Sequence, residues 1–142
     1  MKKLLVLVVV LATAASISVA IATASSAPIV ISYAKTCNEL TGHCAGTANG
    51  VSIDMQVTGF RPTGDAAQLT MDERITVDGG WFTAQLNGHS SPAGFIVLNG
   101  IVTGSSDASL VGAQIHQRSD LVGVAGNETA WVGQLQLMPA SA

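Results

Sequence analysis

Apolar and polar residues alternate with a period of two along most of the chain beyond residue 50. In VSIDMQVTGF, residues 51–60, one face carries the apolar side chains Val51, Ile53, Met55 and Val57. Successive side chains of a β-strand point to opposite faces, so this alternation predicts strands that are buried on one side only. The same alternation recurs in residues 67–77, 82–86, 111–118 and 131–137.

Two segments depart from this simple pattern. Glu73 interrupts the apolar face of residues 67–77. GFIVLNGIVTG, residues 94–104, is apolar at almost every position. We expect it to be a strand buried on both faces, with Asn99-Gly100 as a bulge or a turn.

Glycine with asparagine or aspartate separates the alternating segments. Asn49-Gly50, Asp78-Gly79 and Asn87-Gly88 are typical of hairpin turns, because these residues tolerate a positive φ. No segment beyond residue 24 has the 3.6-residue periodicity of an amphipathic helix. The sequence therefore predicts an all-β fold, a single antiparallel β-sandwich or small β-barrel of about six to eight strands.

The N-terminal segment has the layout of a secretory signal peptide. Two lysines precede an unbroken apolar run, which small residues and A-x-A frames follow. We expect cleavage after Ala24, and the alternative is an uncleaved membrane anchor. The predicted organisation is a signal peptide at 1–24, a short leader or edge strand at 25–36, an all-β domain at 37–138 and a loose tail at 139–142.

Charge excludes several partners for the mature chain. Beyond residue 24, four basic residues, Lys35, Arg61, Arg74 and Arg118, stand against nine acidic ones. Nucleic-acid binding requires clustered basic side chains, so we expect no nucleic-acid partner. We also expect no stable membrane span after cleavage, and a location that is secreted, periplasmic or at the cell surface.

The two cysteines lie in CNELTGHC, residues 37–44. A redox pair usually has two intervening residues and a helix start, and a zinc site usually has four ligands at short spacings. Here six residues intervene, and His43 would add only a third ligand. In an exported protein the ordinary outcome is a disulfide, so we predict one between Cys37 and Cys44.

No catalytic motif is recognisable, and we expect no metal ion, no cofactor and no catalytic residue. The serines lie in turns or on polar strand faces, and no phosphate-binding glycine loop precedes a helix. Trp81 alternates with polar residues and could stack on a sugar ring or cover the end of the core. We therefore name Trp81, His89, His116 and Arg118 as a candidate binding surface.

Three functions are compatible with these features. The first is a secreted, non-catalytic β domain that acts as an extracytoplasmic binding or assembly module, with a protein, a glycan or a second copy in a homo-oligomer as its partner. The second is a small barrel that binds an apolar ligand. The third is a small secreted enzyme that uses His, Asp and Arg side chains, drawn from His89, His116, Asp54 and Arg118.

Overall fold

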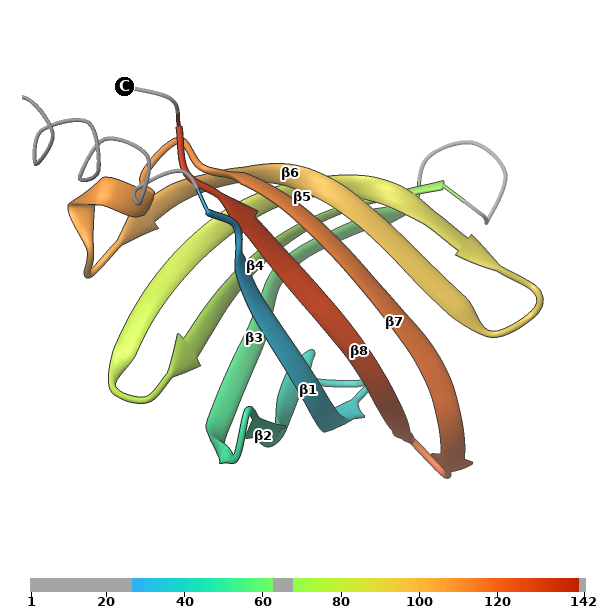
Figure 1. Ribbon diagram of the computed structural model, residues 1–142. Coiled ribbons are helices and arrows are strands. Elements are labelled where there is room, and N and C mark those ends of the chain that lie inside the picture. Colours follow the sequence, from blue (N-terminus) through green and yellow to red (C-terminus); the bar gives the residue numbers. More distant parts are fainter. Residues whose placement is uncertain (1–26, 63–67, 141–142) are drawn as a thin grey trace, which may run out of the picture.

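Eight antiparallel strands form one closed barrel (Figure 1). The computed structural model describes residues 27–62 and 68–140. Each strand pairs with its neighbour in sequence, and the first strand pairs with the last. The strands are β1 (Ile29–Asn38), β2 (His43–Ala48), β3 (Val51–Pro62), β4 (Gln68–Val77), β5 (Gly80–Ser91), β6 (Phe95–Ser105), β7 (Gln114–Ala125) and β8 (Glu128–Met138).

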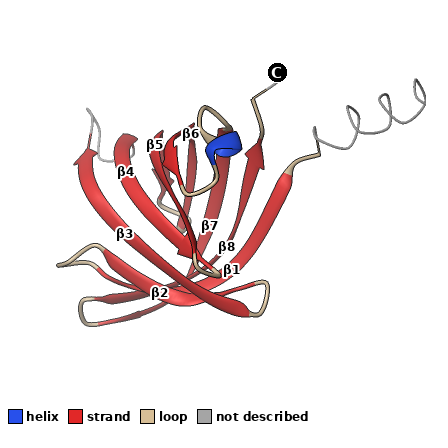
Figure 2. Ribbon diagram, turned by 90° about the vertical axis from the view of Figure 1, so that its left-hand side faces the viewer, coloured by secondary structure: helices blue, strands red, loops and turns tan. Residues whose placement is uncertain are grey.

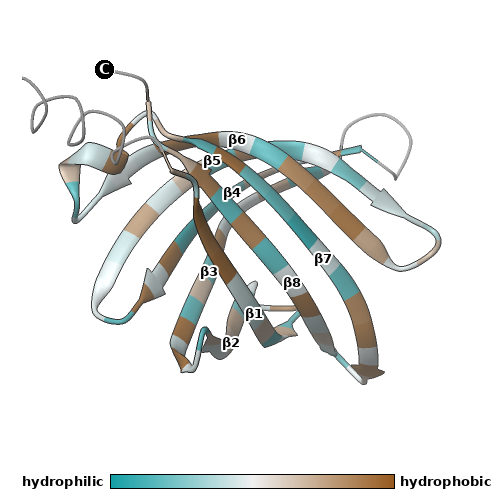
Figure 3. Ribbon diagram, viewed as in Figure 1, coloured by the Kyte–Doolittle hydropathy of each residue, from teal (hydrophilic) through white to brown (hydrophobic). Residues whose placement is uncertain are grey.

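The all-β prediction is confirmed, and closure decides between the two architectures that the sequence left open. The pairing of β1 with β8 runs over ten residue pairs, from Ile29↔Leu137 to Asn38↔Glu128. Apolar and polar bands follow one another along the strands, as the colours in Figure 3 show. Apolar side chains fill the interior, among them Ile53, Met55, Ile75, Phe82, Ala84, Leu86, Leu98, Val102, Ile115, Leu135 and Leu137.

Two predicted hairpin turns are present. Asn49 and Gly50 join β2 to β3 with φ values of 49° and 83°. Asp78 and Gly79 join β4 to β5 with φ values of 49° and 78°. Positive φ at both central positions is the requirement of the type I′ turn, which matches the twist of the flanking strands.

The predicted turn at Asn87-Gly88 is wrong, because both residues lie within β5. A Cβ atom at Gly88 would lie 1.9 Å from the carbonyl oxygen of Val97 in the neighbouring strand. Glycine is required here by the close approach of the two backbones inside the barrel, and not by a turn.

Residues 94–104, which were predicted to form a strand buried on both faces, also differ from that prediction. It forms β6, a strand without a turn, and the register shift between β5 and β6 lies at Thr83/Ala84 instead of at Asn99-Gly100. Leu98 and Val102 are buried, whereas Ile101 is 48% exposed. In a barrel of this size the outer face of every strand meets solvent, whatever the local hydropathy.

β1 begins eight residues before the predicted start of the domain. It pairs with both β2 and β8, so residues 29–36 belong to the barrel and are neither a leader nor an edge strand. The predicted signal peptide lies outside the described residues. Pro139 and Ala140 follow β8 without regular secondary structure. In the described part of the chain, no helix has the length and apolar character needed to cross a membrane.

The two ends of the barrel differ. At one end a short 3₁₀ turn, η1 (Ala108–Leu110), connects β6 to β7 near the end of β8 (Figure 2). Leu110 packs against the core, and Val102 exchanges backbone hydrogen bonds of 2.9 Å with Gly112 and Ala113. We call this the closed end. The opposite end carries the β1–β2, β5–β6 and β7–β8 turns, and we call it the open end.

Candidate functional site

A cavity of about 480 Å³ enters the barrel from the open end. Its rim is formed by the β1–β2 turn, the last described part of β3, and the ends of β5 and β6. Most of its wall is apolar and includes Val57, Phe60, Leu69, Met71, Ile96, Leu98 and Trp131. This volume lies in the range of sites that hold small molecules.

Glu73 brings a carboxyl group into this cavity from β4. It is 2% exposed, and it lies on the same face as the buried Leu69 and Ile75. Its Oε1 atom is buried and has no hydrogen-bond partner among the described residues. Burial raises the pKa of Glu73 to about 6, although the nearby charge of Lys35 acts in the opposite direction. At neutral pH the cavity therefore contains a carboxylate that lacks a hydrogen-bond donor.

Lys35 brings an amino group into the cavity from β1. Its Nζ atom donates a hydrogen bond to Sδ of Met55 at 3.3 Å, and it lies 5.1 Å from the centre of the Tyr33 ring. A thioether is a weak acceptor, so the ammonium group receives little compensation for the water that it has lost. Burial lowers the pKa of Lys35, and the charge of Glu73 offsets part of that effect.

A polar network crosses the interior beside these two charges. Nε2 of Gln117 donates to the hydroxyl of Tyr33 at 3.0 Å, and this hydroxyl shares a hydrogen bond of 2.7 Å with Ser119. Burial raises the pKa of Tyr33 to about 12, against the effect of hydrogen bonds from Ser119 and Gln117. Oε1 of Gln117 is buried and has no partner among the described residues. The network therefore leaves a second unused acceptor.

Gly133 makes room for this network. It lies opposite Tyr33 in the pairing of β1 with β8. A Cβ atom at this position would lie 2.7 Å from the Tyr33 hydroxyl oxygen and 2.4 Å from the carbonyl oxygen of Arg118. Any side chain at position 133 would therefore displace Tyr33 from its partners.

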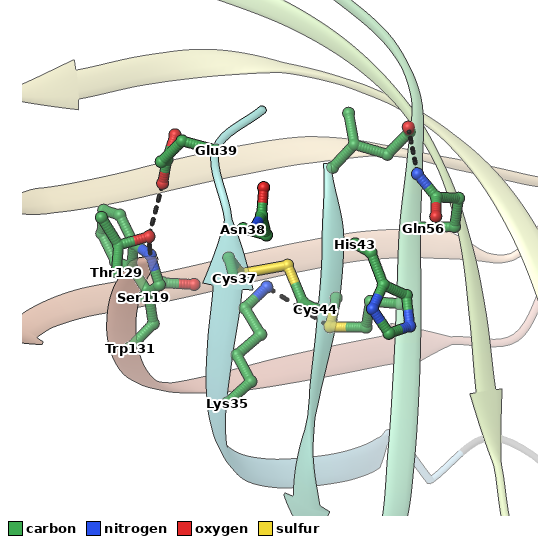
Figure 4. The surroundings of a disulfide bond; sticks show 12 residues. Lys35, Cys37, Asn38, Glu39, His43, Cys44, Gln56, Ser119, Thr129 and Trp131 are labelled. Carbon is green, nitrogen blue, oxygen red and sulfur yellow. Dashed lines mark hydrogen bonds between the residues drawn. A yellow bond between two sulfur atoms is a disulfide. The ribbon is translucent and has the colours of Figure 1, made fainter. Parts of the chain in front are cut away.

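The predicted disulfide is present between Cys37 and Cys44, which are opposite residues of β1 and β2 (Figure 4). Both cysteines are buried, line the cavity and lie beside Lys35. The adjoining β1–β2 turn is bound to the β7–β8 turn, because the Glu39 amide donates to the carbonyl oxygen of Asn127 at 2.8 Å. The disulfide thus fixes one side of the cavity entrance.

Trp131 is held at the same rim by a chain of side-chain hydrogen bonds. Its Nε1 atom donates to the Thr129 hydroxyl at 2.8 Å, and that hydroxyl donates to the Glu39 carboxylate. Figure 4 shows these three residues close to the disulfide. The indole ring is oriented by its polar edge, and its remaining surface is available to the cavity.

The candidate binding surface named from the sequence lies on the outer wall and is not continuous. His89 and Arg118 both contact Phe95, with a ring-centroid distance of 6.2 Å for His89 and 4.5 Å from the Arg118 guanidinium to the ring centre. Arg118 also forms an ion pair with Asp120 at 3.0 Å. His116 is close by, and its Nδ1 atom forms a hydrogen bond of 2.7 Å with Asn99.

Trp81 is separate from that group. It is the second residue of β5, near the closed end, where the guanidinium of Arg74 lies 4.1 Å from the centre of its ring. His43 is also on the outside, paired with Asp54 at 2.6 Å across β2 and β3. None of these side chains is among those that line the cavity.

The sequence reasoning missed the polar residues inside the barrel. Gln117 and Ser119 alternate with His116 and Arg118, and the outward pair was chosen as the candidate site. The sequence did contain a signal for Glu73. Burial of a carboxylate on an apolar strand face costs free energy, and such a residue is seldom fully buried unless it is paired.

The wall of the cavity is largely apolar, with polar side chains from Glu73, Lys35 and Gln117. Among the described residues, no group of three His, Cys, Asp or Glu side chains is arranged to hold a metal ion. The chain matches no family model, no curated protein and no solved structure. The cavity is therefore the basis of the proposed function.

Proposed function

We propose that this protein is a non-catalytic, extracytoplasmic binding protein that holds a small, largely apolar molecule inside the open end of its barrel. The observation that carries the proposal is the combination of a cavity of about 480 Å³ with two buried, unpartnered acceptors, Glu73 Oε1 and Gln117 Oε1. Apolar walls with a few converging polar groups are typical of small-molecule sites.

The alternatives receive less support. Assembly by strand addition needs a free sheet edge, whereas each of the eight described strands has a partner on both sides. An enzyme that uses His116 and Arg118 needs these side chains to meet in a pocket, whereas both are on the outer wall. We therefore favour a small apolar ligand over a protein or a glycan.

The location follows from similar reasoning. A disulfide persists in oxidising compartments, and the first 24 residues have the composition of an export signal. Both features support a protein that works outside the cytoplasm, whether secreted, in a periplasm or at a cell surface.

The test is a fluorescence titration with N-phenylnaphthylamine, an uncharged aromatic probe. We expect saturable binding of one probe per chain. Ser90 lies on the cavity wall, so Ser90→Phe should fill part of the entrance and weaken binding roughly tenfold or more. His89→Phe adds a similar ring to the outer face of the same strand and should bind as the parent protein does.

Two results would contradict the proposal. One is the absence of saturable binding to the parent protein. The other is equal binding by Ser90→Phe and the parent, with both shown to be folded by circular dichroism, because the probe would then bind elsewhere.

A further inference from the structure

The two unpartnered atoms in the cavity are both acceptors. Oε1 of Glu73 and Oε1 of Gln117 are buried, and each belongs to a side chain that is 2% exposed. Buried polar atoms in native proteins nearly always have a partner, so an orphaned pair in a cavity indicates what the cavity accommodates. The missing partner must donate a hydrogen bond.

The remaining polar groups limit the charge of that partner. Lys35 projects into the same cavity, and its ammonium group would repel a second ammonium. A ligand carboxylate would be attracted to Lys35, but its oxygens would face the acceptors of Glu73 and Gln117. A hydroxyl avoids both conflicts because it donates one hydrogen bond and accepts others.

We propose that the ligand is an apolar molecule that ends in a neutral hydroxyl, and that this hydroxyl donates a hydrogen bond to Glu73 Oε1. The inference rests on the proposed function and specifies the head group of the ligand. The hydroxyl oxygen remains free to accept from Lys35, whose Nζ atom donates to the Met55 thioether among the described residues. The hydroxyl thus provides Glu73 with a donor and Lys35 with a better acceptor than a thioether.

Proton linkage distinguishes this head group from the others. A donor to Glu73 stabilises the carboxylate and lowers its pKa from about 6, so binding at pH 6 should release a fraction of a proton. A ligand carboxylate next to Glu73 would raise that pKa and cause proton uptake. The titratable side chains that face Glu73 are Lys35 and Tyr33 of β1; burial raises the pKa of Tyr33 to about 12 and lowers the pKa of Lys35.

Among the described residues of the neighbouring strands no further titratable side chain faces Glu73, and the β1–β2 turn places Glu39 at the rim of the same cavity. β3 and β5 contribute Met55, Val57 and Ala84, β7 contributes Gln117 and Ser119, and β8 contributes Trp131. A proton release near pH 6 that the parent protein shows and Glu73→Gln lacks can therefore be attributed to Glu73.

The experiment is isothermal titration calorimetry of the full chain with octanol, octanoic acid and octylamine. Each ligand is titrated at pH 6 in phosphate and in MES buffer, since the two buffers differ in ionisation enthalpy and so report the protons exchanged. We expect octanol to bind roughly tenfold more tightly than either charged ligand, with proton release. Glu73→Gln should abolish the release and weaken octanol binding several-fold.

Asp72→Asn is the matched control. Asp72 is the neighbouring acid on β4, and it points outward to Arg61. This variant should behave as the parent protein. If Glu73→Gln does not fold, the affinities of the parent protein for the three octyl ligands still decide.

The inference is overturned if octanoic acid binds as tightly as octanol, if Glu73→Gln releases protons on octanol binding as the parent protein does, or if no octyl ligand binds. Saturable binding of N-phenylnaphthylamine in that last case would leave the proposed function standing and refute only the head group. Absence of binding by all four compounds would remove both.

Discussion

Ile115 and Gln117 are two residues apart on the inner face of β7, and each is 2% exposed, yet their surroundings differ. Ile115 lies toward the closed end, where it pairs with Leu137 and is surrounded by apolar side chains. Gln117 lies toward the open end, where it lines the cavity with Glu73 and Lys35. One strand thus contributes to a packed core and to the polar part of the cavity wall.

The two regions of the interior therefore have different roles: the closed end contributes to stability, and the open end to the proposed binding of a ligand. Close packing at the closed end contributes the burial that holds the barrel together. The open end contains a carboxylate and an ammonium without a direct ion pair between them, an arrangement that costs stability. Stability does not explain those charges, whereas the proposed ligand would.

Deletion of a leucine side chain at each end should give the largest effect. Leu137→Ala at the closed end should lower the free energy of unfolding by about 3–5 kcal/mol, because it leaves a void in a packed region. Leu69→Ala on the cavity wall should cost about 1–3 kcal/mol, since its neighbourhood already includes open space. Urea unfolding of the two variants measures both values. Equal losses would show that the two ends of the barrel do not differ in packing.

The disulfide should rank next. The Cys37→Ala/Cys44→Ala variant should lose about 2.5 kcal/mol, the chain-entropy value for a loop of about eight residues. Without the disulfide, β1 is still paired with both β2 and β8. Local opening at the cavity entrance should therefore increase before the rest of the barrel is affected. Hydrogen exchange should accelerate in β1 and β2 while β6 near η1 keeps its protection. A uniform loss of protection would show that the open end is not an independent region.

Glu73 should make stability depend on pH. Its pKa is raised from 4.5 to about 6 in the folded protein, so the native state binds the proton more strongly than the unfolded chain does. The contribution of Glu73 to stability should be greatest below pH 4.5 and should fall by about 2 kcal/mol as the pH rises through 6. Glu73→Gln should remove this decrease, whereas Asp72→Asn should retain it.

Urea unfolding at pH 4.5 and pH 7.5 is the measurement for that prediction. If the parent protein and Glu73→Gln lose the same stability between pH 4.5 and pH 7.5, Glu73 does not carry a buried charge at the higher pH.

The outer wall should give the smallest effect. Arg118→Ala removes the ion pair with Asp120 and the contact with Phe95, both at the surface. The expected loss is within about 1 kcal/mol, and binding of N-phenylnaphthylamine should not change. Thermal unfolding and the same probe titration check this, and a large loss of binding would move the site from the interior to the outer wall.

Much of the fold could be predicted from the sequence, because period-two alternation directly reports which side of a strand is buried. The pattern of residues 67–77 placed Leu69, Ile75 and Glu73 on one face, and all three are buried. Barrel closure could not be predicted, because the same alternation suits a sandwich. Gly88 was misread for a related reason, since a glycine at a close backbone approach and a glycine in a turn look alike in sequence.

The site was harder to predict because it forms only when distant strands meet. Tyr33 and Ser119 are 86 residues apart, and Tyr33 and Gln117 are 84 apart. Alternation does not say whether a polar position faces solvent or a cavity, so His116 and Arg118 were chosen in place of the inward Gln117 and Ser119. The misplaced carboxylate at Glu73 was the one local signal of the cavity.

A crystal structure of the protein with bound N-phenylnaphthylamine tests the central claim most directly. We predict one probe inside the open end of the barrel, in contact with Trp131, Met71 and Leu98. A probe bound instead on the outer wall against Phe95 and His89, with the interior unoccupied by it, would contradict the account.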